Sequence, residues 1–183
     1  MEKTEFEIQQ LQTAGLFLSA LTPDGPQAYL SNIEALEAAL GRRLSRPILM
    51  PVVRRAISLK LDKMNHTPPN QWAWCTYWLA TIVETQFGAG LIGFKGPPDD
   101  QGMVEFGYGI DPFVSGHGYT TEAAAAIIEW AFKTPACLRI VAPKTGKDNP
   151  ASHRVLNKLG MQAYAETEED ISYQLSRRAF FNR

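Results

Sequence analysis

The chain has 183 residues, of which 45% are hydrophobic and 20% are charged. A chain of this size buries about two-thirds of its unfolded surface, so we expect one globular domain spanning residues 1–183. Its 18 Lys and Arg side chains nearly balance its 19 Asp and Glu side chains, and the net charge is −1. This balance excludes the strongly basic surface of nucleic-acid-binding proteins, so we expect no nucleic acid among the partners.

The beginning of the chain and its cysteines indicate a cytoplasmic protein. Lys and Glu side chains interrupt residues 1–15, where a signal peptide would need an uninterrupted apolar region. No apolar stretch approaches the length of a membrane span, so we expect no membrane partner. Cys75 and Cys137 are the two cysteines, without a CxxC motif. We therefore expect reduced thiols and no metal site.

The first part of the chain alternates between strand and helix patterns. Residues 15–21 (GLFLSAL) predict a strand after a short polar lead. Residues 27–41 carry apolar side chains at three-to-four spacing and end on Gly41, which predicts an amphipathic helix. A second helical pattern, residues 47–64, is broken or kinked at Pro51.

The pattern then changes to short apolar runs. Residues 76–84, 88–96 and 102–110 predict three antiparallel strands, and a glycine loop leads into a helix that ends near Lys133. The remaining pattern predicts a strand, a helix and two strands, at residues 138–142, 149–160, 162–167 and 171–176. The order indicates an α+β fold, with a mixed, mostly antiparallel sheet of about seven strands flanked by helices.

The glycine loop has the composition of a phosphate-binding loop. Gly116 and Gly118 can adopt positive φ and turn backbone N–H groups toward one point, beside the N-terminus of the next helix. The sequence lacks the GK[ST] ending of a P-loop and the third glycine of a dinucleotide fingerprint. An ordinary glycine-rich turn into a helix explains the loop equally well.

The strand before this loop has two unlike faces. Val104, Phe106, Tyr108 and Ile110 alternate on one face, whereas the other face carries Glu105 and two glycines. Glycines weaken a strand unless something approaches its backbone closely. By itself, Glu105 is better explained as a solvated carboxylate at a sheet edge.

The segment VEFGYGIDPFVSGHGYTTEAAAAIIEWAF, followed by LRIVAPKTGKDNPASHRVLNKLGM, resembles the acyl-CoA-binding core of the GNAT superfamily of N-acetyltransferases. It is most similar to the branch that acetylates N-terminal amines of ribosomal proteins. The similarity is dense from Gly88 to Gly160, whereas residues 41–75 match no known pattern. The resemblance implies a GNAT-like acyl-CoA N-acyltransferase fold. It also implies acetyl-CoA as co-substrate and a primary amine, either a peptide N-terminus or a small molecule, as acceptor.

The resemblance assigns the cofactor-binding residues. In that family the loop binds the CoA pyrophosphate and reads Arg or Gln, two residues, Gly, one residue, Gly or Ala. Ser115, Gly118 and Thr120 stand at these positions, so a long side-chain donor is missing and Thr120 adds bulk. His117 could replace the donor or lie solvated. The implied cofactor site comprises Ile110, Ser115, Gly116, His117, Gly118, Tyr119, Thr120, Asn149 and Ser152.

The resemblance also assigns the catalytic residues. It implies Glu105 as the general base and Ser152 as the acid that protonates the departing thiolate. Asn149 would bind the pantetheine arm, although its place as a helix N-cap explains it without a ligand. Many family members have a tyrosine four residues beyond Ser152, where this chain has Leu156. That substitution moves the acid role to Ser152, with Tyr164 as a remote alternative.

The acceptor and the oligomeric state stay open. Arginines between residues 42 and 55 could recognise an acidic amine or be solvated, and the tryptophans at 72, 74 and 78 could form core or a homodimer contact. Two other classes of function compete with the enzyme. One is a CoA-binding regulatory module of the same fold, and the other is an interaction domain that binds no CoA.

Overall fold

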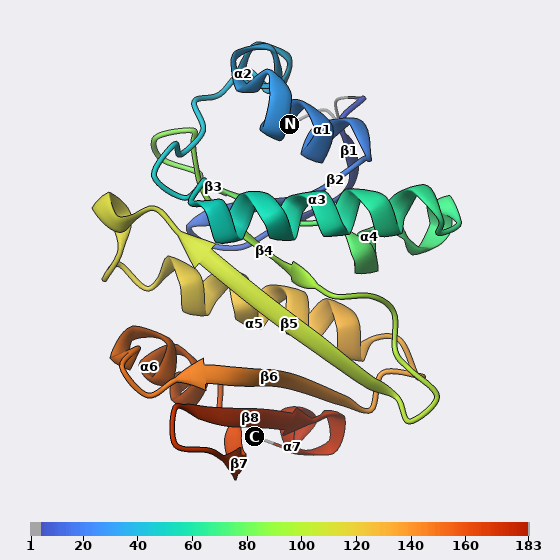
Figure 1. Cartoon of the computed structure of the whole chain (residues 1–183), viewed down its shortest axis with the longest axis vertical. Helices are drawn as coiled ribbons and strands as arrows, with labels where there is room; N and C mark the ends of the chain where they lie inside the picture. The colour runs from blue at the N-terminus through green and yellow to red at the C-terminus, as the bar shows by residue number, and fades with distance from the viewer. Residues whose placement is uncertain (1–4, 183) are drawn as a thin grey trace.

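The structure, a computed structural model, describes residues 5–182, which form one eight-stranded sheet with helices on both faces (Figure 1). The strand order is β1-β2-β3-β4-β5-β6-β8-β7. Neighbouring strands are antiparallel except β5 and β6, which are parallel. The strands are β1 (Glu7–Gln12), β2 (Leu16–Leu21), β3 (Trp78–Ile82), β4 (Phe87–Phe94), β5 (Met103–Ile110), β6 (Arg139–Gly146), β7 (Gln162–Glu166) and β8 (Asp170–Ser176).

The predicted mixed, mostly antiparallel sheet is confirmed, with one strand more than expected. The additional strand is β1, which the sequence pattern treated as a polar lead. Its sequence EIQQLQ is half glutamine, and it forms the edge of the sheet beside β2. An edge strand packs against one neighbour only, so its sequence needs less apolar alternation than a central strand.

The helices differ from the prediction mainly in the first third of the chain. The predicted helix at 27–41 is two helices, because Asn32 leaves the helical conformation (φ −153°) and its side-chain oxygen accepts a hydrogen bond from the N–H of Ala35. The third helix begins at Pro51, a residue that fits the first turn of a helix. The helices are α1 (Asp24–Ser31), α2 (Ile33–Leu40), α3 (Pro51–Asn65), α4 (Trp72–Cys75), α5 (Tyr119–Phe132), α6 (Pro150–Lys158) and α7 (Arg177–Phe181), with 3₁₀ turns η1 (Pro69–Gln71) and η2 (Pro112–Val114).

Two hydrophobic cores lie on the two faces of the sheet. Figure 1 shows α5 behind the sheet and α3 in front of it. The larger core packs β2 to β6 against α5 and α6, and the smaller core packs β2 to β4 against α1, α2 and α3. Trp74, Trp78, Phe94 and Trp130 form an aromatic cluster in the larger core, with neighbouring ring centroids 4.6 to 6.0 Å apart. Trp74 and Trp78 are therefore core residues.

A buried ion pair ties the end of α2 to the sheet. The Arg42 guanidinium lies 3.7 Å from the Glu7 carboxylate of β1, and both side chains are almost fully buried. Arg42 also donates to the Thr81 hydroxyl of β3 at 3.1 Å and to the Leu40 carbonyl at 3.1 Å. Both cysteines are buried and free. Within residues 5–182, no helix has the length and apolar character needed to cross a membrane.

Candidate active site

The site begins where β5 and β6 separate. The two strands pair in parallel from Met103 opposite Arg139 to Glu105 opposite Val141, and the pairing ends there. β5 continues to Ile110 and β6 to Gly146, so the gap between them widens toward their C-terminal ends. Figure 1 shows the two arrowheads pointing apart at the same side of the molecule. A gap of this kind leaves one edge of β5 without a neighbouring strand.

The backbone groups on that edge can be assigned from the register. Along an antiparallel ladder, successive residues direct their N–H and C=O groups alternately to the two sides. Asp111 N–H donates to Ala89 in β4 at 2.7 Å, and Lys95 N–H donates to the Glu105 carbonyl at 2.8 Å. The odd-numbered residues of β5 therefore direct their backbone groups toward β4. The even-numbered residues Tyr108 and Ile110 direct theirs to the other side, toward β6 and into the gap.

The mouth of the gap is formed by the glycine loop. The buried Asp111 carboxylate accepts a hydrogen bond from Phe113 N–H at 2.9 Å, which starts η2 directly after β5. Gly116 (φ +86°) and Gly118 (φ +87°) then adopt the positive φ that the sequence suggested. Gly118 is the N-cap of α5, so the free N–H groups of that helix point toward the same mouth.

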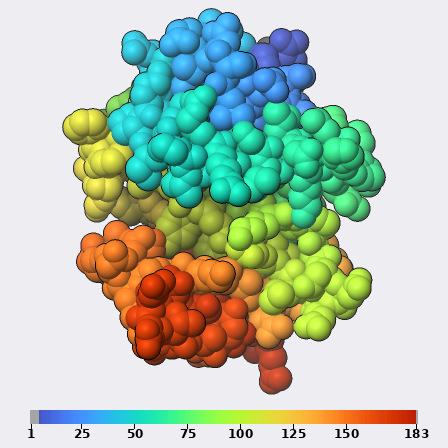
Figure 2. Space-filling view, in the orientation of Figure 1, coloured from blue at the N-terminus to red at the C-terminus, as the bar shows by residue number. Residues whose placement is uncertain are grey.

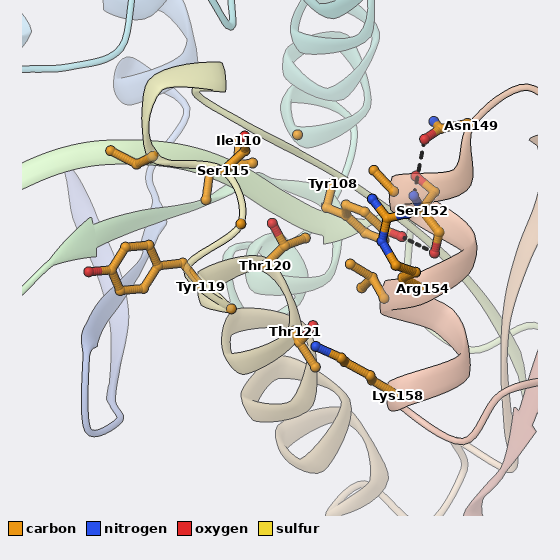
Figure 3. Close-up of a pocket in the computed structure, with 16 residues that line it drawn as sticks. Tyr108, Ile110, Ser115, Tyr119, Thr120, Thr121, Asn149, Ser152, Arg154 and Lys158 are labelled. Atoms are coloured by element: carbon orange, nitrogen blue, oxygen red, sulfur yellow. Dashed lines mark hydrogen bonds between the residues drawn. The ribbon is translucent and has the colours of Figure 1, made fainter.

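The opposite wall of the gap is α6. Asn149 caps this helix, because its side-chain oxygen accepts from Ser152 N–H at 3.0 Å. The cap uses the oxygen of Asn149, so its NH₂ group is the part that can donate to a ligand. The phenol of Tyr108 reaches across from β5 and donates to the Ser152 carbonyl at 3.4 Å (Figure 3). Arg154 and Lys158 follow on the same side of α6.

Together these elements enclose a cavity of about 390 Å³. In the space-filling view it opens at the notch between the yellow loop after β5 and the orange α6 (Figure 2). Most of the residues predicted for the cofactor site line it: Ile110, Ser115, Gly116, Gly118, Tyr119, Thr120, Asn149 and Ser152. The structure therefore brings together side chains that are up to 42 positions apart in the sequence, from Ile110 to Ser152.

His117 is not among the lining residues. Its Nδ1 lies 3.1 Å from the Val114 carbonyl and 3.2 Å from the Ser115 carbonyl, and its ring stacks on Tyr119. The side chain is exposed and turned back on its own loop. Its placement matches the alternative of a solvated loop histidine.

Glu105 lies at the point where β5 and β6 separate, outside the cavity lining. Its side chain is on the opposite face of β5 from Tyr108, together with Gly107 and Gly109. A Cβ at Gly107 would meet no atom of residues 5–182 within 4 Å, whereas one at Gly109 would approach Ile48 at 3.6 Å. The face next to Glu105 therefore has open space that α3 and the segment before it border.

Lysines surround Glu105 on this face. Lys95 forms an ion pair with the Glu105 carboxylate, and Lys63 donates to the Lys95 carbonyl at 2.6 Å. Lys60 is buried, and its ammonium donates to the carbonyls of Cys75, Thr76 and Phe94. Burial lowers the pKa of Lys60 to about 7. The Glu105 side chain remains about one-third exposed, so solvent can reach it.

Four of the five arginines between residues 42 and 55 are engaged within the chain: Arg43 forms an ion pair with Glu37 at 3.6 Å, and three others make further contacts. Arg42 pairs with Glu7, Arg46 bonds to Glu37 and Glu34, and Arg54 donates to the Leu30 carbonyl. The bond from Arg46 lowers the pKa of Glu37 to about 2. These three arginines serve the packing of α1, α2 and α3, which the sequence alone did not reveal.

The lining residues that the predicted cofactor set did not contain include Tyr108, Thr121 and Val155. Alternation correctly placed Tyr108 on the apolar face of β5, and it packs against the larger core. Nothing in the sequence showed that its phenol would cross to α6, because that contact joins residues 44 positions apart. Thr121 lies one position beyond the loop motif, and Val155 is a partly buried residue of α6 that packs against the larger core.

A parallel strand pair that splays apart, with a positive-φ glycine loop and a helix N-terminus at its mouth, defines the acyl-CoA N-acyltransferase fold. Comparison with known proteins gives the same result. The sequence profile of the acetyltransferase (GNAT) domain matches residues 44–162, more than half of the chain. The chain belongs to the GNAT acetyltransferase family.

The chain is also similar in sequence to a bacterial protein described as an N-acetyltransferase. The uncharacterized N-acetyltransferase YjdG of Bacillus subtilis (strain 168) is 35% identical over 83 residues, which are 45% of this chain and 49% of that protein. The chain thus matches about half the length of this relative.

Among solved structures, the ribosomal L7/L12 alpha-N-protein acetyltransferase RimL, in complex with coenzyme A, superposes with a TM-score of 0.66 at 16% identity over 93% of this chain and 99% of that one. The ribosomal-protein-S5-alanine acetyltransferase from Vibrio fischeri gives a TM-score of 0.64 at 15% identity, covering 94% and 99%. At these identities the two structures show the fold.

Proposed function

We propose that the protein transfers an acetyl group from acetyl-CoA to a primary amine, by direct attack of the amine while both substrates are bound. The observation that carries this proposal is the free edge of β5 at Tyr108 and Ile110, which faces a cavity between the glycine loop and α6. An extended amide-bearing chain can bind such an edge as an additional strand would. The pantetheine arm of CoA is a chain of this kind.

The residues present fit the donor substrate. The N–H groups of the Gly116–Gly118 loop and of the first turn of α5 would hold the pyrophosphate. Arg154 and Lys158 line the same cavity from α6 and add the positive charge that phosphates require. Asn149 would donate its NH₂ group to the pantetheine amides. Acetyl-CoA supplies an acyl group activated as a thioester.

In the proposed reaction, Glu105 would act as the base. An ammonium has no lone pair, so the acceptor must lose a proton before it can attack. The Glu105 carboxylate lies at the apex of the gap, beside the open space at Gly107. Ile110 is five residues further along the strand, about 16 Å away, so Glu105 would take that proton through water. The N–H of Ile110 would stabilise negative charge on the acyl oxygen, a contribution of about 3 kcal/mol in comparable sites.

The acceptor belongs to the class of primary amines, either a peptide N-terminus or a small molecule. RimL and the enzyme from Vibrio fischeri are named for ribosomal proteins, which favours a peptide N-terminus. The internal pairing of Arg42, Arg46 and Arg54 weakens the idea that these arginines recognise an acidic acceptor.

The first test is thermal unfolding with and without acetyl-CoA, with NADH and ATP as controls. A ligand at 100 times its dissociation constant adds about 2.7 kcal/mol, which raises the midpoint of a protein of this size by about 5 to 10 °C. No shift at millimolar acetyl-CoA would refute the proposal. A specific shift leads to an amine panel, with release of free CoA thiol as the readout.

Glu105→Gln then tests the base. We expect turnover at pH 7 to fall about 100-fold and the loss to shrink at high pH, where the acceptor amine is already neutral. Glu129→Gln on α5 is the matched control, because Glu129 is an exposed carboxylate paired with Lys133. A pH profile unchanged by Glu105→Gln would remove Glu105 as the base.

The second candidate function is a CoA-binding module without catalysis. It is favoured by Ser115, whose hydroxyl donates to the Pro112 carbonyl at 2.8 Å and is thus engaged within the loop. It is also favoured by Thr120, whose side chain occupies part of the cavity wall. This candidate predicts a thermal shift with acetyl-CoA and no thiol release with any amine.

A further inference from the structure

Two phenols line the cavity, and they point in different directions. Tyr119 lies at the start of α5, where its ring is close to Gly15 in the β1–β2 turn. Tyr108 lies on β5 and extends across the gap toward α6 (Figure 3). Of the two hydroxyls, that of Tyr108 is therefore placed between the strand edge and Ser152.

The hydrogen bond that holds the Tyr108 hydroxyl is long. Its acceptor, the Ser152 carbonyl, is 3.4 Å away, beyond the usual range for an O–H donor. That carbonyl also belongs to the first turn of α6, where a helix carbonyl accepts from the N–H four residues later. The Tyr108 O–H can therefore leave the Ser152 carbonyl, which is a weak and shared acceptor, and donate to a ligand without the loss of a strong hydrogen bond.

The cavity that contains this hydroxyl is also lined by Ile110, where the acyl group would bind. If the acyl oxygen accepts from Ile110 N–H, the sulfur lies one bond from the carbon that carries that oxygen. Tyr108 is two residues earlier on the same edge, about 6.6 Å along the strand, and its ring spans a comparable distance. The phenol thus borders the place where the carbon–sulfur bond breaks.

The environment keeps the phenol protonated. Burial raises the pKa of Tyr108, although the contact with Ser152 opposes that shift. At neutral pH the side chain is therefore a proton donor. A phenol is also a much stronger acid than the aliphatic hydroxyl of Ser152.

We propose that Tyr108 is the general acid of this site, taking the place that Leu156 leaves vacant in α6. This inference rests on the proposed acetyl transfer. In the step, the amine lone pair forms the new carbon–nitrogen bond and the amine proton passes through water to Glu105. The carbon–sulfur bond breaks with its electron pair on sulfur, and Tyr108 transfers its phenolic proton to that sulfur. The tyrosinate regains a proton from solvent at the cavity mouth, and Glu105 releases its proton to solvent.

The test compares two acyl donors in single-turnover acyl transfer. A thiolate needs a proton as it leaves, whereas the selenolate from acetyl-seleno-CoA is a far weaker base and leaves without one. For Tyr108→Phe we expect the rate with acetyl-CoA to fall about 10- to 100-fold and the rate with the selenoester to stay within about threefold of wild type. Acetyl-CoA affinity, read by thermal shift, should stay unchanged, since phenylalanine keeps the ring.

The control variant removes a phenolic oxygen from a tyrosine outside the cavity. Tyr29→Phe deletes a buried phenolic oxygen in the smaller core, on the other face of the sheet, and should leave both rates unchanged. Ser152→Ala, tested in parallel, should lower the thioester rate less than Tyr108→Phe does.

Three results would overturn the assignment. An unchanged thioester rate in Tyr108→Phe would show that the phenol transfers no proton in the step that limits acyl transfer. Equal losses with both donors would show a structural role. Selective loss with the thioester in Ser152→Ala, and not in Tyr108→Phe, would return the acid role to Ser152. A wild-type protein that binds acetyl-CoA but acetylates no amine would instead refute the proposed function, and with it the role of Tyr108.

Discussion

The buried ammonium of Lys60 makes the stability of this protein depend on pH in a predictable direction. Its Nζ donates to the carbonyls of Cys75 and Thr76 at 3.2 Å each and to that of Phe94. It also lies over the Tyr77 ring, 4.5 Å from the centroid. Burial is the main reason that the pKa of Lys60 falls from 10.5 to about 7, and the nearby charges that modify it are Cys75, Lys63, Lys95 and Glu105.

The sign of the effect follows from proton binding. Between pH 7 and 10.5 the unfolded chain keeps a proton on Lys60 that the folded chain has lost, so the free energy of unfolding rises with pH. With the folded pKa near 7, the gain between pH 7 and pH 9 is about 2.3 kcal/mol. For a chain of this length, that gain raises the melting temperature by about 5 to 9 °C.

The measurement is the unfolding free energy of the wild type and of Lys60→Met at pH 7, 8 and 9. Methionine has a similar length and no titrating group, so the difference between the two profiles isolates Lys60. We expect the wild type to gain on the variant by about 2.3 kcal/mol across this range. Lys133→Met, on an exposed lysine of α5, should run parallel to the wild type.

Parallel profiles for the wild type and Lys60→Met would refute this reasoning. They would mean that the three carbonyl acceptors stabilise the ammonium enough to offset its burial. Lys60 would then keep its proton throughout the range and act as a permanent tie between α3, the start of β3 and the end of β4.

Two further substitutions probe the loop and the buried ion pair. Gly118→Ala introduces a Cβ at a residue with φ +87°, and this Cβ would meet no atom of residues 5–182 within 4 Å. Backbone strain alone should therefore lower the free energy of unfolding, by about 1 kcal/mol. Acetyl-CoA affinity, measured by calorimetry, should fall at least about tenfold, since the Cβ lies at the cavity mouth; unchanged affinity would contradict the assigned phosphate site. Arg42→Met removes the Arg42 guanidinium from the buried ion pair with Glu7 and should cost about 3 kcal/mol or more in urea unfolding. A loss below about 1 kcal/mol would show that this pair contributes little.

The sequence predicted the elements that carry strong periodicity. Alternating apolar residues indicated β5, and the alanine-rich helical pattern indicated α5, which ends at Phe132 close to the predicted Lys133. The break at Asn32 was missed because the apolar spacing continues across it. Asn32 interrupts the helix through its own backbone angles and a cap to Ala35, an effect that hydrophobic spacing does not detect.

The site was predictable where it depends on local sequence. Gly116 and Gly118 have the positive φ that glycine alone adopts easily, and Asn149 caps α6 in the way its position before Pro150 suggested. The role of Tyr108 was not predictable, because it depends on how far β5 and β6 separate. The ion pair between Lys95 and Glu105 was not predictable either, because it depends on the register of β4 and β5, which places the two residues side by side.

The departure from the family loop at Ser115 is compatible with the proposed phosphate site. A loop whose side chain reached the phosphates would need a long donor at position 115, but Ser115 instead donates to Pro112 and fixes the loop itself. The positive charge lies on the facing wall, because Arg154 and Lys158 of α6 line the same cavity as the glycines. Backbone N–H groups on one wall and two cations on the other would surround a bound anion from both sides. In the proposed site, the side-chain charge would come from α6 and not from the loop, so binding would depend on how firmly α6 is held against β5.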